Sequence, residues 1–215
     1  MTVVFGDGRG GFSSPGVQFP VGKSPYERVR VADINGDGHV DIITTNHEGD
    51  SVTILLGDGK GGFTEAAGSP FPAGKSPFGV AIADLNGDGK PDLAVVNYSG
   101  HADQPANDGV TILLGDGKGG FKIMVGSPFP TGHAPTRLAI GDVNGDGIPD
   151  VVTNNLASND ITILLSGKGT FTRAATIVVG GGPYGLALGD LNGDGKADIV
   201  VANSRDNNIS VLMSR

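Results

Sequence analysis

Short apolar segments recur along the chain, and each is bounded by polar or turn-forming residues. They are five to seven residues long, rich in Val, Ile, Leu and Thr, and end at Gly, Pro, Asn or Asp. Segments of this length and composition predict β-strands. No stretch shows a 3.6-residue apolar period long enough for a helix. The pattern therefore predicts an all-β fold.

The predicted strands belong to a unit that occurs four times. Each unit runs from an apolar segment through an acidic loop into two further apolar segments, and then through a glycine turn into a fourth. The acidic loops have the pattern D-x-N-G-D-G-x-x-D and occupy residues 33–41, 84–92, 142–150 and 190–198. Their first aspartates are 51, 58 and 48 residues apart. Such a period indicates a repeat architecture, so we expect residues 1–215 to form a single repeat domain.

The negative charge of the chain is concentrated in these loops. The formal net charge is −8, and the four loops hold 12 of the 23 acidic residues. Four divalent cations would therefore neutralise the chain. The acidic balance argues against nucleic acid as a partner, because nucleic-acid binders present a basic face.

Other features of the composition narrow the alternatives. Cysteine is absent, which excludes disulfides and thiolate metal sites. No signal peptide is visible at the start of the chain. No apolar run reaches the roughly 18 residues that a bilayer requires, so we expect no membrane span.

The first acidic loop shows why this pattern suits a cation. Asp33, Asn35 and Asp37 occupy alternate positions, so a curled loop can direct their oxygens to one point. The backbone carbonyl of His39 would add a ligand, and Asp41 would close the site. Oxygen donors of this kind suit Ca²⁺, whereas Mg²⁺ demands stricter octahedral geometry. We therefore expect about four calcium ions in the chain.

Two other interpretations of the loop are weaker. An EF-hand loop requires a bidentate Glu at its twelfth position, and dockerin-type calcium repeats fail on the same ground. The residues at that position are Thr44, Val95, Thr153 and Val201, inside apolar runs. Clusters of Asp, Asn and Gly also form ordinary turns, but four copies that all keep the three aspartates and the asparagine favour metal binding.

Several motifs together resemble the FG-GAP or VCBS repeat family, which includes the calcium-loop β-propellers of integrin α-subunit heads and many bacterial surface proteins. The motifs are the four acidic loops, the VTILLGDGKGGF segments, and the pieces SPY (24–26), SPF (76–78) and GPY (182–184). The resemblance implies that each loop joins two strands of a blade and binds Ca²⁺, with the seventh residue contributing its carbonyl. The implied ligands are Asp33, Asn35, Asp37, His39, Asp41, Asp84, Asn86, Asp88, Lys90, Asp92, Asp142, Asn144, Asp146, Ile148, Asp150, Asp190, Asn192, Asp194, Lys196 and Asp198.

The resemblance also implies a β-propeller of four-stranded antiparallel blades, about four in this chain. We expect blades over residues 28–73, 79–130, 137–180 and 185–215, with strands in residues 1–20 completing a blade. The first strands alternate large and small residues, which agrees with blades that narrow towards a crowded axis.

The number of third-strand segments leaves the closure of the ring open. This segment occurs five times, because residues 2–5 duplicate the role of residues 208–213. The chain could close a four-bladed ring, form part of a longer array, or form half of an eight-bladed dimeric ring. Unpaired strand edges in an open array would favour a homo-oligomer through blade pairing.

Alternating strand directions predict two distinct faces. The lower face carries the acidic loops and glycine turns, and the upper face carries the remaining loops, which differ between repeats. Loops on a rigid scaffold commonly carry binding residues, although a merely solvated rim is the alternative. An aromatic residue follows proline in three of the repeats, and Tyr26 is one of these residues. This recurrence favours a packing role between blades for Tyr26. The ligand-binding candidates are Tyr26, Arg28, His47, Tyr98, His101, His133 and Arg137.

Two classes of function are compatible with this sequence. The favoured class is a non-enzymatic, calcium-stabilised binding or adhesion module for protein or glycan ligands, outside the cell or at its surface. The alternative is a polysaccharide lyase or hydrolase on the same scaffold. The chain contains no G-x-S-x-G, H-E-x-x-H or phosphate-loop motif. Because metal would also occupy the loop carboxylates, we expect no enzyme.

Overall fold

The chain folds into β-strands joined by turns. The computed structural model describes residues 1–98, 108–167 and 169–215. In these ranges the one helical element is the 3₁₀ turn η1 (His47–Gly49). The described part contains no helix that is long and apolar enough to cross a membrane. The all-β prediction is confirmed.

Three antiparallel sheets have the form of propeller blades. Blade 1 has the strand order β3-β4-β5-β6 with β7 also paired to β5, blade 2 has the order β8-β9-β10-β11 with β12 also paired to β10, and blade 3 has the order β13-β14-β15-β16. Blade 1 contains β3 (Pro25–Ala32), β4 (Asp41–Asn46), β5 (Ser51–Gly57), β6 (Phe63–Glu65) and β7 (Phe71–Pro72). Blade 2 contains β8 (Pro77–Ala83), β9 (Asp92–Asn97), β10 (Gly109–Gly115), β11 (Phe121–Ile123) and β12 (Phe129–Pro130). Blade 3 contains β13 (Pro135–Gly141), β14 (Asp150–Asn155), β15 (Asp160–Gly167) and β16 (Thr170–Val178).

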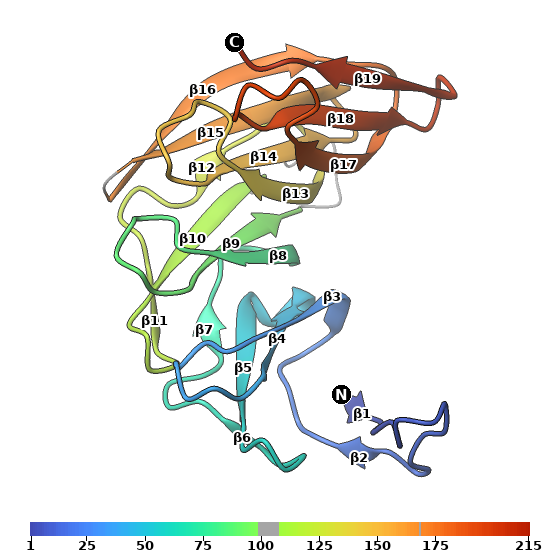
Figure 1. Cartoon of the computed structure of the whole chain (residues 1–215), viewed down its shortest axis with the longest axis vertical. Coiled ribbons are helices and arrows are strands. Elements are labelled where there is room, and N and C mark those ends of the chain that lie inside the picture. Colours follow the sequence, from blue (N-terminus) through green and yellow to red (C-terminus); the bar gives the residue numbers. More distant parts are fainter. Residues whose placement is uncertain (99–107, 168) are drawn as a thin grey trace.

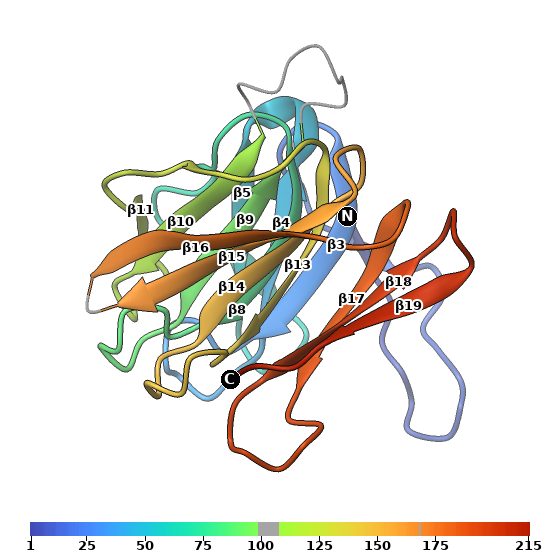
Figure 2. The ribbon, with the colours of Figure 1, turned by 90° about the horizontal axis from the view of Figure 1, so that it is seen from above.

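Blade 4 has three strands, and the blades together form an open arc. Its strands are β17 (Pro183–Gly189), β18 (Asp198–Asn203) and β19 (Asn208–Leu212). The first strands β3, β8, β13 and β17 lie beside one another in this order along the arc (Figure 1). In the view from above, β17 to β19 lie at one end of the array (Figure 2). Blade 4 pairs with no other sheet among the described residues, so the arc is a propeller fragment and not a closed ring.

The hydrophobic core consists of layers between successive blades. The second strands β4, β9 and β14 are buried along their whole length, because each lies between two neighbours. Ile43 and Val52 of blade 1, for example, share one cluster with Val80 and Val95 of blade 2. Ala202 in β18 of the last blade is instead exposed. Burial of a blade therefore depends on the blade that follows it.

Each blade begins slightly before the predicted boundary, at a proline. The starting residues are Pro25, Pro77, Pro135 and Pro183. Each follows a residue with positive φ, and each faces the asparagine that ends the second strand of its own blade. In blades 1, 2 and 4 the Pro-aromatic pieces therefore form the start of the inner strand, where the pairing register shifts.

Residues 1–20 form a separate hairpin beside blade 1. The strands β1 (Thr2–Val3) and β2 (Val17–Gln18) pair with each other, and neither pairs with β19. Phe19 of the hairpin packs on Phe63 of blade 1, and corresponding pairs of phenylalanines pack at the junctions of blades 1 and 2 and of blades 2 and 3. The ring-centroid distances are 5.3 Å for Phe19–Phe63, 5.7 Å for Phe71–Phe121 and 5.4 Å for Phe129–Phe171. The hairpin thus occupies the place of the outer half of a blade preceding blade 1, and it does not complete blade 4.

Candidate functional site

The first aspartate of each acidic loop organises the loop backbone. Asp33 follows β3, and its two carboxylate oxygens accept hydrogen bonds from the amides of Gly36 and Gly38, each at 2.8 Å. Both glycines have positive φ, 76° and 85°, which L-residues with a side chain rarely adopt. The same pair of bonds recurs at the first aspartate of the other three loops.

The middle of the loop joins an asparagine to an aspartate. In the first loop, Asn35 Nδ2 donates to Asp37 Oδ2 at 2.9 Å, and the Asp37 amide donates to Asn35 Oδ1 at 3.0 Å. The Asn35 amide and then the His39 backbone amide lower the pKa of Asp37 below its usual value. The loop is thus built to keep an exposed carboxylate ionised.

The last aspartate of each loop is buried and ties the loop to the third strand. Asp41 is fully buried; its Oδ2 accepts the Ile34 amide and its Oδ1 the Gly57 amide, both at 2.8 Å. The equivalent pairs of amide donors are Leu85 and Gly115 for Asp92, Val143 and Ser166 for Asp150, and Leu191 and Ser214 for Asp198. Sequence reasoning missed this second role, because one donor lies 16 or more residues away.

The environment shifts the pKa of these aspartates in different directions. Burial raises the pKa of Asp92 and Asp150, and this effect exceeds the opposing effect of their amide donors. The amides of Leu191 and Ser214 lower the pKa of Asp198 in the last blade. Among the first aspartates, the amides of Gly195 and Gly193 lower the pKa of Asp190.

The donors of the loop fit calcium in chemical type. An oxygen that accepts one amide hydrogen bond keeps a second lone pair, so Asp33, Asn35 and Asp37 retain acceptor capacity towards a cation. Oxygen donors are the ligands that Ca²⁺ prefers. No group of three or more acidic or histidine side chains in the described ranges gathers into a metal cluster. The third position of each loop is an asparagine and the last carboxylate faces backbone amides, which leaves two carboxylates at the surface of each loop.

The glycine turns lie directly beside the acidic loops and complete the lower face. A Cβ atom at Gly59 would come within 2.4 Å of the His39 ring, and one at Gly117 within 3.2 Å of the Lys90 side chain. The seventh residue of each of these two loops therefore lies on the neighbouring turn. Positive φ favours glycine at both positions.

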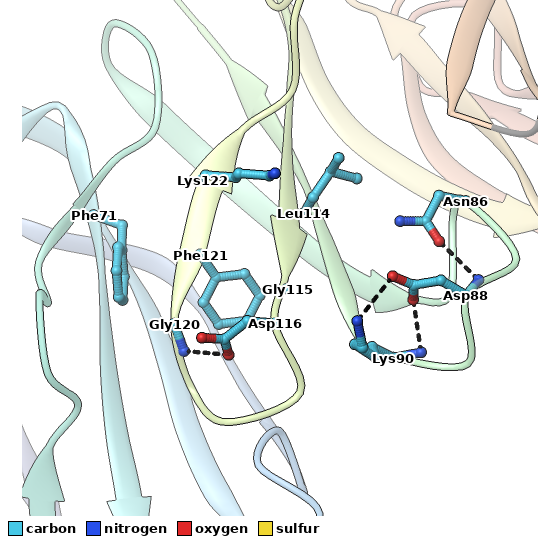
Figure 3. Close-up of a pocket in the computed structure, with 10 residues that line it drawn as sticks. All are labelled: Phe71, Asn86, Asp88, Lys90, Leu114, Gly115, Asp116, Gly120, Phe121 and Lys122. Carbon is cyan, nitrogen blue, oxygen red and sulfur yellow. Dashed lines mark hydrogen bonds and ion pairs between the residues drawn. The ribbon is translucent and has the colours of Figure 1, made fainter.

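A pocket opens on this face where blade 1 meets blade 2. Its volume is about 520 Å³. Figure 3 shows it between the second acidic loop and the turn that joins β10 to β11. The side chains that line it include Phe71, Asp88, Lys90, Asp116, Phe121 and Lys122. This pocket could not be predicted from the sequence, because its walls come from two blades.

Three of the predicted upper-face residues are brought together around one phenylalanine. Phe78 packs against Tyr26, Tyr98 and His47, with ring-centroid distances of 5.1, 5.2 and 6.4 Å. Tyr26 and His47 are 5.3 Å apart, and Tyr26 is 48% exposed. This aromatic cluster spans the junction of blades 1 and 2.

The other upper-face candidates lie apart from this cluster. The Arg137 guanidinium stacks on the ring of Tyr184 at 4.4 Å, between blades 3 and 4. His133 is exposed, and its backbone amide donates to Ser158 Oγ at 2.9 Å. His101 and the side chain of Arg28 lie outside the described residues. The predicted residues thus do not form one site.

A family profile identifies the repeats. The FG-GAP-like repeat profile matches residues 33–95, 98–153 and 150–201, which together make up most of the chain. The chain belongs to the FG-GAP-like repeat family. The predicted family is therefore confirmed, and no curated protein sequence matches this chain significantly.

Solved structures support the propeller fold of this FG-GAP-like protein. A lectin from Agrocybe aegerita, described as recognising non-reducing terminal N-acetylglucosamine, has a TM-score of 0.55 at 18% identity, covering 100% of this chain and 57% of the lectin. BBS1N, solved in complex with ARL6DN, has a TM-score of 0.55 at 17% identity, covering 90% of this chain and 59% of BBS1N. This chain thus spans less than two thirds of either protein, and at these identities the likeness shows the fold alone.

Proposed function

We propose that this FG-GAP-like chain is a calcium-stabilised binding module that engages protein or glycan ligands outside the cell or at its surface. The observation that carries the proposal is the repeated loop geometry, in which one oxygen-rich loop with two surface carboxylates occurs four times at equivalent positions. Asp33, Asn35, Asp37 and the carbonyl of His39 would hold the ion in the first loop, with Asp41 behind them. A bound Ca²⁺ supplies positive charge that offsets the loop carboxylates.

The upper face is the proposed ligand surface. Its aromatic cluster combines the exposed ring of Tyr26 with Tyr98 and His47 at one blade junction. Aromatic rings with polar groups at their edge suit both protein and sugar contacts, because they offer a large apolar area and a hydrogen-bonding tip. The shared fold is compatible with a binding role, since the similar lectin is described as recognising a sugar and BBS1N was solved with a protein partner.

Calcium is expected to raise the melting temperature of the protein. A ligand that binds only the folded state stabilises it by about 2.7 kcal/mol per site at a hundred times its Kd. Differential scanning calorimetry of chelated protein, with Ca²⁺ or with Mg²⁺ added, measures this effect. Equal melting temperatures in chelator and in Ca²⁺ would contradict the metal assignment.

Binding and catalysis are separated by a second experiment. A glycan array probed with and without chelator is expected to show calcium-dependent binding. A parallel assay for unsaturated products released from uronate polymers is expected to be negative. Product release at an enzymatic rate would favour the polysaccharide-lyase alternative over a binding module.

A further inference from the structure

The lower-face pocket has two lysines at positions where blades 1 and 3 have other residues. The strand register places Lys122 opposite Leu114, as Thr64 lies opposite Leu56 in blade 1 and Thr172 opposite Leu165 in blade 3. Lys90 stands where the first and third loops have His39 and Ile148. Blade 2 alone among these three blades therefore combines both cations at one pocket, in a chain of net charge −8.

The two lysines have different surroundings. Lys90 Nζ lies 3.4 Å from Asp88 Oδ2, a long contact between two partly exposed groups. The ammonium group of Lys122 forms no ion pair or hydrogen bond with any described residue. Figure 3 shows the Lys122 side chain extended across the pocket towards Leu114. Lys122 thus supplies an available positive charge at the pocket.

The rest of the pocket offers an apolar surface and hydrogen-bond acceptors. Leu114 lies on the same face of the hairpin as Lys122 and supplies the apolar surface there. Phe121 points to the other face, where it packs edge-on against the buried ring of Phe71 of blade 1. Asp116 Oδ1 accepts the amides of Lys118 and Gly120 at 2.7 and 2.9 Å, whereas its Oδ2 accepts no hydrogen bond within the described residues. A ligand with a flat apolar face, hydroxyl donors and one negative charge complements these groups. The volume of about 520 Å³ is ample for a small ligand of this kind.

We propose that this pocket binds an acidic sugar of the hexuronate type, with its carboxylate held by Lys122. The C–H face of the sugar ring lies against Leu114, which shares one face of the hairpin with Lys122, and its hydroxyl groups donate to Asp116 Oδ2. Inorganic anions lack both the apolar face and the hydroxyl donors, so they match the charge of Lys122 alone. This site goes beyond the proposed function, because it lies on the face opposite the aromatic cluster of Tyr26 and Tyr98.

Titration calorimetry with trigalacturonate tests the site, and the neutral galactose trisaccharide serves as the matched ligand. Lys122→Thr introduces the residue of blades 1 and 3, so the variant is expected to fold. It is expected to weaken trigalacturonate binding about tenfold or more, as loss of a hydrogen bond to a charged group does. Lys118→Thr removes the same charge from an exposed position of the turn before β11 and is expected to change affinity less than about twofold.

Three results would overturn the proposal. They are no binding of trigalacturonate to the unaltered chain, equal affinity for the neutral trisaccharide, and equal loss of affinity in the Lys122 and Lys118 variants. Tyr98→Ala, on the upper face, is expected to leave trigalacturonate binding unchanged. If the pocket binds no trigalacturonate, the calcium-dependent stability and the upper-face binding are still open to test. Scanning calorimetry and the glycan array measure these two properties independently of the pocket.

Discussion

At the scale of single residues, aspartates of one loop motif have two different tasks. Asp33 and Asp37 are surface carboxylates that organise the loop and can face a cation. Asp41 is buried and connects two strands of the blade through two amide donors. The motif repeats both tasks four times, so its recurrence reflects the needs of folding as well as those of metal binding.

Removing the buried carboxylate is expected to destabilise the chain even without metal. Asp92→Ala leaves the buried amide of Leu85 and the partly buried amide of Gly115 without their acceptor, which costs about 2 kcal/mol or more. Asp88→Ala changes an exposed carboxylate and is expected to cost less than about 1 kcal/mol in chelator. Urea denaturation of both variants in chelator gives the comparison. Equal stabilities would show that Asp92 acts only through the metal.

The motif could be predicted from the sequence, but its buried hydrogen bonds could not. Spacing identifies Asp33, Asn35 and Asp37 as one group because they are local in the chain. The Asp41–Gly57 bond depends on how the third strand pairs, and no local pattern specifies that partner. The aromatic cluster is predictable only in part: the sequence identifies Tyr26, His47 and Tyr98 as candidates, but it does not identify Phe78 as their common neighbour.

At the scale of elements, each blade is attached to the next through a linker glycine. Gly74 follows β7 and precedes β8, and a Cβ there would lie 2.5 Å from Thr111 Oγ1 and 2.6 Å from Asn97 Nδ2. Corresponding glycines approach the asparagine that ends β4, β14 and β18. The linker therefore packs on a buried asparagine, and a side chain would push the blades apart.

Gly74→Ala is expected to destabilise the protein more than Gly89→Ala. The two glycines have nearly the same φ, 79° and 80°, so the backbone strain of the substitution is similar. A Cβ at Gly89 would meet no atom within 4 Å, whereas one at Gly74 overlaps buried side chains. The added cost at Gly74 is about 1–3 kcal/mol, typical of overpacking. Denaturation in chelator measures both variants, and a larger loss for Gly89→Ala would contradict the packing argument.

At the scale of the whole molecule, burial depends on a neighbouring blade. Val52, Val110 and Ile161 are the second residues of the third strands of blades 1 to 3, and each is 0% exposed. Ile209 holds the same position in β19 and is 65% exposed. The blade architecture and the order of strands were predictable from the repeat. The open arc was not, because local patterns specify a blade and say nothing about ring closure.

The free edge of β19 is expected to make the 215-residue chain self-associate as its concentration rises. An unpaired strand that also exposes apolar side chains is a template for another strand, and β19 pairs only with β18 among the described strands. Ile209→Asp places a charge in this surface and is expected to reduce association. Val125→Asp is the matched control, because Val125 is 95% exposed and lies outside the strands. Sedimentation velocity over a concentration series compares the three proteins, and calorimetry checks that each remains folded. If the unaltered chain stays monomeric throughout, or if both substitutions reduce association equally, the edge of β19 is not what brings the molecules together.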